Sequence, residues 1–211
     1  MAKLKIYTFP DTILTQKAMP IARVEKSYRK LAEDMLETMY DAPGIGLAAN
    51  QVGILERIIV LDVDYDYEEL EADMQVPAGA EVFGRSVVTN RKPIVIINPE
   101  IIYKEGKTSI SEGCLSVPEY TAEVQRSKKI KLQYQDLDGL TQTLAAEDLF
   151  SVAIQHEMDH LEGKLFIDRL SPLKKEMAQK QLRKERAERE ADFRLGHDGL
   201  MNPREAKKKG F

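Results

Sequence analysis

Residues 146–162 of this 211-residue chain read AEDLFSVAIQHEMDHLE, a segment with neither glycine nor proline. Glu147 and Asp148 stand where a first helical turn would begin, and Gly163 follows the segment directly. Acidic side chains stabilise the N-terminus of a helix, and glycine often ends one. The segment therefore predicts a helix with a marked start and a marked end.

Two faces of this predicted helix are apolar. Helical spacing places one set of residues on a single face: Leu149, Val152, Ala153, His156 and His160. A second set lines another face: Phe150, Ile154, Met158 and Leu161. A helix that is apolar on two sides is typically buried, so we expect this one in the interior of the protein.

His156, Glu157 and His160 form the pattern HExxH. Imidazoles four residues apart on a helix can bind one divalent metal ion, and the intervening glutamate can act as a base on a nearby water molecule. The alternative is a pair of ordinary core histidines, but two imidazoles buried beside Glu157 and Asp159 would need several hydrogen-bond partners. The motif therefore predicts a catalytic metal site.

A catalytic site of this kind needs a third protein ligand. Four downstream residues have suitable side chains but lie in polar segments or lack a supporting motif: Asp168, Glu176, Glu185 and His197. Upstream, Cys114 lies in EGCLSVP, residues 112–118, where Gly113 would let another backbone approach closely. A lone cysteine is commonly just a small buried residue. As a thiolate, however, it suits zinc or ferrous iron, and it is the candidate third ligand.

The flanking segments predict an α+β fold, in which small and mostly antiparallel sheets pack around the buried HExxH helix. Residues 24–39 have the spacing of an amphipathic helix. Residues 57–63 and 93–98 are apolar, β-branched runs typical of buried strands. Residues 129–134 alternate like a half-exposed strand and precede Asp138-Gly139, a hairpin-turn signal.

Charge is unevenly distributed along the chain, whose net charge is -4. Residues 62–84 contain eight acidic residues and no Lys or Arg, which predicts an exposed, mobile acidic insertion at about residues 64–91. Residues 173–211 carry 12 Lys/Arg against 7 Asp/Glu, with a helix expected over residues 174–192. We therefore expect a catalytic domain, residues 1–172, and a charged C-terminal helix and tail that belongs to it or is appended to it.

Cellular location is indicated by what the sequence lacks. No run of 18 apolar residues occurs, and the start MAKLKIYTFP has no apolar core of a secretory signal. The single cysteine excludes an internal disulfide. A cytoplasmic protein without a membrane partner is expected, and its basic tail is of the kind that docks onto anionic surfaces such as RNA.

Three separate segments together resemble the signature motifs of the bacterial peptide deformylases. They are GIGLAANQ at residues 44–51, in a glycine-rich segment predicted as a loop, EGCLS at residues 112–116, and QHEMDHLEG at residues 155–163. The resemblance covers most of residues 5–175. Asn50 stands where many members have Pro or Thr, and the acidic insertion is longer than in the shorter members. Neither departure changes a metal ligand.

The resemblance implies a metal-dependent hydrolase that removes the formyl group from N-formylmethionine at the start of new polypeptides and releases formate. It supports Cys114, His156 and His160 as the metal ligands. It implies that Glu157 is the general acid and base. It also implies that Gln51 and the backbone N–H of Leu115 stabilise the negative charge that develops on the formyl oxygen.

The substrate contacts follow from the same resemblance and from the helix face. Ile45 and Gly46 would offer main-chain hydrogen bonds to a substrate lying as an added strand. Leu149, Val152 and Ala153 share the face of the histidines and would line a pocket for the methionine side chain.

The resemblance also implies a cofactor and partners. Family members usually work with Fe²⁺ and accept Zn²⁺, Ni²⁺ or Co²⁺, and thiolate and imidazole ligands admit all of these. The partners implied are N-formylmethionyl nascent peptides and, through the basic C-terminal helix, the ribosome.

Two alternatives stay open at this level. A zinc endopeptidase would share HExxH but take a downstream glutamate, Glu185, as its third ligand. A non-catalytic RNA-binding factor would use the basic tail and a purely structural metal. Replacing Cys114 by serine separates the first alternative from a deformylase, and replacing Glu157 by alanine separates the second.

Overall fold

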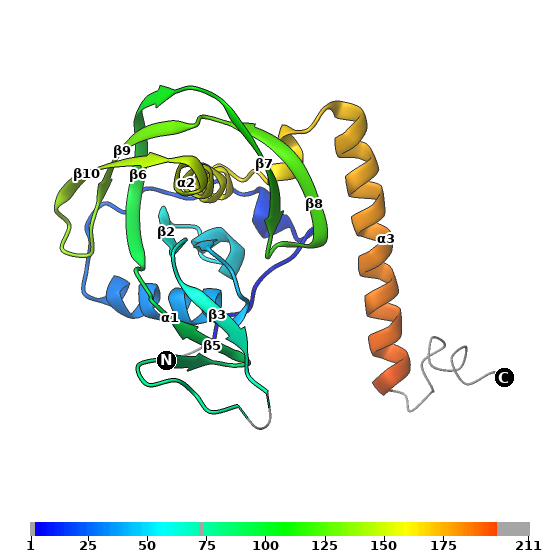
Figure 1. Ribbon diagram of the computed structural model, residues 1–211. Helices are drawn as coiled ribbons and strands as arrows, with labels where there is room; N and C mark the ends of the chain where they lie inside the picture. Colours follow the sequence, from blue (N-terminus) through cyan, green and yellow to red (C-terminus); the bar gives the residue numbers. More distant parts are fainter. Residues whose placement is uncertain (1–2, 72–73, 198–211) are drawn as a thin grey trace. The chain divides into compact units, whose positions relative to one another are not determined.

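The computed structural model describes residues 3–71 and 74–197, with side chains up to residue 191. The chain divides into two compact units, Met1–Arg169 and Leu170–Phe211. The first unit is a mixed α and β structure with antiparallel sheets, and the second contains one long helix (Figure 1).

A five-stranded sheet with the order β1-β2-β6-β9-β10 forms the main framework of the first unit, and all four strand pairs are antiparallel. Its strands are β1 (Gly46–Ala48), β2 (Ile58–Leu61), β6 (Ile94–Glu105), β9 (Lys129–Gln135) and β10 (Thr141–Glu147). The predicted strands correspond to β2, β6 and β9, and the predicted turn joins β9 to β10 with Gly139 at φ 77°. The short strand β1 occupies one edge of the sheet.

The glycine-rich segment at residues 44–53 was predicted to be a loop, and this prediction is partly wrong. It contains strand β1, which pairs with β2, and a short 3-10 helix, η2 (Ala49–Val52). Three residues of pairing were too few to produce a recognisable alternation, so only the tertiary partner β2 reveals the strand.

Two smaller sheets complete the first unit. The acidic insertion forms a sheet of β3 (Asp66–Glu69), β5 (Ser86–Thr89) and β4 (Glu81–Phe83), in that order. Its exposure was predicted correctly for β3, whose four residues are exposed, but not for Phe83, Val87 and Val88, which are buried. The second small sheet pairs β7 (Thr108–Cys114) with β8 (Val117–Arg126), two strands that the apolar pattern did not predict.

Helices cover both faces of the five-stranded sheet. On β2, Ile58 and Val60 belong to one core cluster with helix α1 (Ser27–Asp41). Ile59 and Leu61 belong to the other cluster, with helix α2 (Asp148–Leu161). Side chains of a strand alternate between the two faces of a sheet, so this short apolar strand contributes to both cores.

Helix α2 confirms the predicted helix at residues 146–162 to within two residues at each end. It packs against β1, β2, β9 and β10, and Figure 1 shows it nearly end-on, with the β7–β8 sheet on its other side. Most of its predicted apolar positions are buried: Val152, Ala153, Ile154, His156, His160 and Leu161. Leu149 is 43% exposed, and Phe150 and Met158 are half-buried.

The second unit contains α3 (Pro172–His197), which extends the predicted helix at both ends. Its surface carries charged pairs four residues apart, such as Arg186 with Glu190 at 2.9 Å. Such exposed pairs stabilise a helix only slightly. Among the described residues, no helix is long and apolar enough to cross a membrane.

Candidate metal centre and active site

Three side chains from two distant segments converge at one point. Cys114 is the last residue of β7, and His156 and His160 lie one turn apart on α2. One ligand atom from each lies within 4.8 Å of the other two, and Sγ of Cys114 is 3.3 Å from Nε2 of His160. The structure thus brings together the three residues that the sequence nominated as metal ligands.

The chemistry of these residues fits a divalent cation. Two imidazoles and one thiolate form a donor set that suits zinc or ferrous iron. Burial alone would lower the pKa of His156, but hydrogen bonds with Cys114 and Glu112 raise this pKa well above its ordinary value. The surroundings of His156, with the Cys114 sulfur and Glu112 beside its ring, therefore favour a positive charge.

Glu157 is a buried carboxylate beside this donor set. It is 5% exposed, and its Oε2 has no hydrogen-bond partner among the described residues. Burial raises the pKa of Glu157 to about 7. A buried carboxylate that has an oxygen without a hydrogen-bond partner and a pKa near neutrality is suited to accept and return a proton at physiological pH.

Gly46 on β1 leaves the space that Glu157 occupies. A Cβ atom at residue 46 would lie 2.5 Å from Oε1 of Glu157 and 2.9 Å from its Cδ, closer than side chains normally approach. Gly46 thus has a second, steric role besides the main-chain contact suggested by the sequence.

Replacing Gly46 by alanine should push the Glu157 carboxylate out of place and lower kcat by about 10- to 100-fold, because a small displacement of a catalytic group is costly. The three candidate ligands, Cys114, His156 and His160, are unchanged, so metal content should stay the same. Steady-state kinetics together with metal analysis of the purified variant would check this. An unchanged kcat would show that Glu157 has room to move without consequence.

Gln51 and Leu115 lie close to the same point. Gln51 is 1% exposed on η2, and its Nε2 lies 3.6 Å from Sγ of Cys114. Leu115 follows Cys114 in the turn between β7 and β8, which places its backbone next to the sulfur. Gln51 thus has a hydrogen-bond donor beside the three candidate ligands, and Leu115 lines the same cavity.

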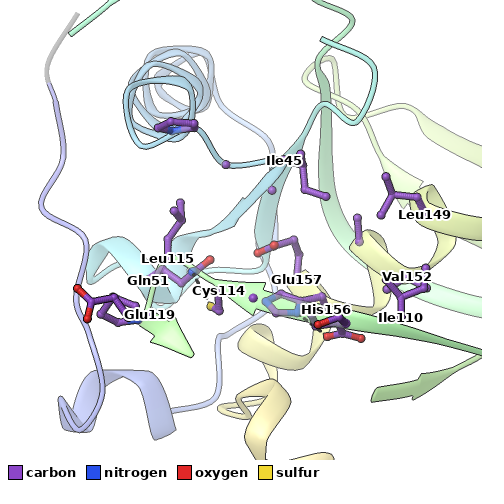
Figure 2. A pocket seen from close by; sticks show the side chains of 18 residues that line it. Ile45, Gln51, Ile110, Cys114, Leu115, Glu119, Leu149, Val152, His156 and Glu157 are labelled. Atoms are coloured by element: carbon purple, nitrogen blue, oxygen red, sulfur yellow. Dashed lines mark hydrogen bonds and ion pairs between the residues drawn. The ribbon is translucent and has the colours of Figure 1, made fainter. Parts of the chain in front are cut away.

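A cavity of about 500 Å³ opens over these groups. Figure 2 shows Gln51, Cys114 and His156 together at one part of it, with Ile45, Leu149 and Val152 farther along. Every predicted site residue except His160 lines it: Ile45, Gly46, Gln51, Cys114, Leu115, Leu149, Val152, Ala153, His156 and Glu157. His160 is 1% exposed and contacts the site through Sγ of Cys114.

A network of buried charged side chains holds the Nδ1 side of the His156 ring. Nδ1 of His156 lies 2.8 Å from Oε2 of Glu112, whose carboxylate accepts two hydrogen bonds from Arg126, at 2.6 and 2.8 Å. The other side of Arg126 donates to Asp159 at 2.6 Å, and Asp159 also accepts from Arg169. Because Nδ1 of His156 is committed to Glu112, Nε2 is the ring nitrogen that contacts the Cys114 sulfur.

The two carboxylates of this network stay ionised inside the protein. Burial would raise the pKa of Glu112, but hydrogen bonds from Arg126 and His156 outweigh it and lower this pKa. Burial would also raise the pKa of Asp159, and Arg169 and Arg126 reverse that effect. The network is thus a row of alternating charges that compensate one another.

The sequence did not identify this supporting network. Glu112 belongs to the EGCLS segment, so its position two residues before Cys114 was an available signal. Arg126 gave no signal, because it lies twelve residues after Cys114, on a strand that the apolar pattern did not predict. Two of the downstream ligand candidates have other hydrogen bonds: Asp168 accepts the backbone N–H of Leu165 at 2.8 Å, and Glu185 accepts a hydrogen bond from Gln181 on α3. The side chain of His197 lies outside the described residues.

The two histidines of an HExxH helix lie beside a cysteine, and a buried glutamate lines the adjoining cavity. This combination is typical of metal-dependent hydrolases. A family model described as polypeptide deformylase matches residues 3–176. The peptide deformylase of Nitrosococcus oceani is 45% identical over 184 residues, which cover 87% of this chain and 96% of the relative. The chain belongs to the peptide deformylase family.

Solved structures agree with this assignment. The crystal structure of a peptide deformylase from Legionella pneumophila has a TM-score of 0.72 and 37% identity, covering 88% of this chain and 96% of that one. The enzyme from Ehrlichia chaffeensis, solved in complex with actinonin, has a TM-score of 0.71 and 35% identity, covering 88% and 98%. The chain is therefore a hydrolase that removes the N-formyl group from formylmethionine of new polypeptides, and the endopeptidase alternative is not favoured.

Proposed function

We propose that Cys114, His156 and His160 bind one divalent metal ion, Fe²⁺ in the cell, and that Zn²⁺, Ni²⁺ or Co²⁺ can replace it. The observation that carries this proposal is the convergence of their ligand atoms within 4.8 Å, beside a cavity that Glu157 lines. An ion held there would supply positive charge that acidifies a water molecule and polarises the formyl carbonyl. Thiolate and imidazole ligands suit all four metals, so the preference for iron rests on family membership.

Glu157 takes the proton of the attacking water in this proposal and later delivers it to the leaving amine. Its open Oε2 and its pKa of about 7 support both steps, since the same group must be a base first and an acid second. Burial keeps bulk water from competing for the carboxylate.

Gln51 and Leu115 are proposed to stabilise the negative charge that develops on the formyl oxygen. One Nε2 hydrogen of Gln51 faces the Cys114 side, and the backbone N–H of Leu115 belongs to the residue directly after Cys114. Donors that are already oriented lower the barrier because they need no reorganisation when charge appears.

The peptide is proposed to bind as an extra strand along β1. This strand is an edge of the five-stranded sheet, and both Ile45 and Gly46 line the cavity. The Ile45 carbonyl accepts the N–H of Asp62 on the β2 side. Neighbouring residues of a strand direct their backbone groups to opposite sides, so those of Gly46 are available at the open edge.

Leu149, Val152 and Ala153 are proposed to line the pocket for the methionine side chain. All three lie on α2 and line the cavity, and Leu149 is 43% exposed although it is apolar. An exposed apolar side chain next to buried ones is typical of a pocket wall that a ligand covers.

The finer organisation of the chain is proposed as well. In this view the sheets pack around α2 as the scaffold of the metal site, residues 1–172 form the catalytic domain, and residues 173–211 form a charged appendage that contacts the ribosome. The basic excess of the appendage supports this partner, because ribosomal RNA is anionic. The cytoplasm, where formylated polypeptides emerge, is the proposed location.

Formate release from formyl-Met peptides tests the proposed metal and activity together. Protein prepared without oxygen and loaded with Fe²⁺ should release formate, and chelator-treated protein should not. Reloading with Zn²⁺, Ni²⁺ or Co²⁺ should restore activity to different degrees. Full activity in the chelated protein would contradict the metal proposal.

Replacing Cys114 by serine should weaken metal binding by at least about 100-fold, because a neutral hydroxyl is a poor substitute for a thiolate ligand. Titration of the metal-free variant with Co²⁺, followed by optical spectroscopy, would measure the affinity and the loss of the sulfur-to-metal band. An endopeptidase-type site with Glu185 as ligand would bind the ion equally well in the variant.

Removing residues 173–211 should abolish co-sedimentation with ribosomes and leave the hydrolysis of short formyl-Met peptides within about twofold of the full chain. A matched full-length variant with glutamine at the basic positions of this segment separates charge from length. Unchanged co-sedimentation of the truncated chain would exclude this segment as the contact.

A further inference from the structure

The side-chain amide of Gln51 is held at two points inside the protein. Its Oε1 accepts a hydrogen bond from the backbone N–H of Ala48 at 2.8 Å, and its Nε2 donates one to Oγ of Ser116 at 3.1 Å. Nε2 also lies 3.6 Å from Sγ of Cys114. Gln51 is 1% exposed and Ser116 is 0% exposed, so water does not compete for these bonds.

The two anchors restrict different motions of the amide. The terminal torsion of glutamine is soft, so an unanchored amide can turn over or swing. The Ala48 N–H can only donate, and it therefore selects the orientation in which Oε1 faces it. The Ser116 hydroxyl can donate or accept, so it does not select between the two ends. It fixes where the NH₂ group lies, and one of the two Nε2 hydrogens remains for the side of Cys114.

Ser116 acts without touching the cavity. It is fully buried and is not one of the cavity-lining residues of the described chain. Its backbone N–H points to Sγ of Cys114 at 3.4 Å, and its carbonyl accepts the N–H of Phe9 at 2.8 Å. The same N-terminal segment reaches Gln51, whose carbonyl accepts the N–H of Tyr7 at 2.7 Å. The segment thus fixes the two loops relative to each other, which makes the hydroxyl a stable anchor.

We propose that Ser116 is a positioning residue for deformylation, whose hydroxyl holds the Gln51 amide so that the N–H facing the Cys114 sulfur is aimed at the formyl oxygen. The inference rests on the proposed role of Gln51. An anchored donor stabilises developing charge better than a mobile one, because it is oriented before the reaction starts. Displacing such a group by about 1 Å can cost about 100-fold in rate.

Replacing Ser116 by alanine should lower kcat by about 10-fold or more, because the Gln51 amide is no longer held in its orientation. KM should stay within about twofold, because the residues that line the cavity are unchanged. Metal content should not change, since the backbone N–H beside Cys114 is retained. Ser86, 2% exposed on β5, provides the control for the loss of a buried serine hydroxyl, and Ser86→Ala should keep the wild-type kcat. An unchanged kcat in Ser116→Ala would overturn the inference.

A double-mutant cycle with Gln51→Ala separates positioning from a general structural effect. If Ser116 acts through Gln51, adding Ser116→Ala to Gln51→Ala should change kcat by less than about twofold. A full additional loss would overturn the inference.

The same cycle distinguishes the role of Ser116 from the role of Gln51. A Gln51→Ala variant with wild-type kcat would remove the proposed role of Gln51 itself. A damaged Gln51→Ala variant beside a fully active Ser116→Ala variant would overturn the positioning role alone. Should circular dichroism show that Ser116→Ala does not fold, Ser116→Gly, which also lacks the hydroxyl, replaces it under the same criterion.

Discussion

Replacing Glu157 by glutamine should lower kcat by about 100- to 10,000-fold, the range usual for the loss of a general acid or base. Glutamine has nearly the same shape, so the buried site beside Gly46 should accept it, and metal content should be that of the wild type. The variant keeps the metal ligands and the cavity but has no group that accepts the proton of water. Formate release measured with metal-loaded protein, together with metal analysis, checks both parts.

The pH profile of the same variant gives an independent reading. A base must be deprotonated to act, so the wild-type rate should rise with pH through the pKa of Glu157, which burial raises. Glu157→Gln should lose this acidic limb. The exposed Glu123 on β8 offers a control, and Glu123→Gln should retain both rate and profile. A Glu157→Gln enzyme within about threefold of the wild type would remove Glu157 from the mechanism.

The elements that could be predicted are those whose sequence signals lie within one short segment. Helix α2 was recognisable because its apolar spacing, its acidic start and Gly163 all lie within one segment. The histidines and Glu157 were recognisable because a helix by itself fixes the geometry of residues one turn apart. Convergence of Cys114 on them depended on the β7–β8 sheet, which the residue pattern did not predict, and the family resemblance supplied that link.

The β7–β8 sheet escaped prediction for a physical reason. The buried side of β7 includes Glu112, a charged residue where an apolar one marks most strands. Glu112 can be buried because Arg126 on β8 pairs with it. Arg126 pairs at the same time with Asp159 on α2, so the buried charges balance one another. A pattern of apolar residues cannot show such a compensation, because the partners are brought together only by the fold.

Replacing Arg126 by methionine should destabilise the protein by about 3–5 kcal/mol, because it leaves two buried carboxylates without their shared partner. The Arg126 side chain is 1% exposed, and those of Glu112 and Asp159 are 4% and 9% exposed, so water cannot take its place. For a protein of this length the loss corresponds to a fall in Tm of about 6–20 °C. Thermal and urea denaturation of the metal-free proteins would measure it.

The direction of the pH dependence distinguishes this cause from a simple packing defect. In the wild type the pKa values of Glu112 and Asp159 are lowered, so their contribution to stability is present at neutral pH and is lost as pH falls through the folded-state pKa values. In Arg126→Met these pKa values should rise, and protonation then relieves the buried charge. The stability difference between variant and wild type should therefore shrink as pH is lowered from neutrality, whereas a packing defect would keep it constant.

Two further variants complete the test. Arg29 pairs with Asp138 at the surface, where the two side chains are 49% and 68% exposed, so Arg29→Met should change stability by less than about 0.5 kcal/mol. Combining Arg126→Met with Glu112→Gln and Asp159→Asn neutralises the two carboxylates that paired with Arg126. It should recover part of the lost stability, because Arg169, the other partner of Asp159, is 43% exposed and can be solvated. The triple variant should still bind metal about 10- to 100-fold more weakly, because His156 has lost the carboxylate that orients it. Wild-type metal affinity in that variant would show that the buried network serves the fold alone.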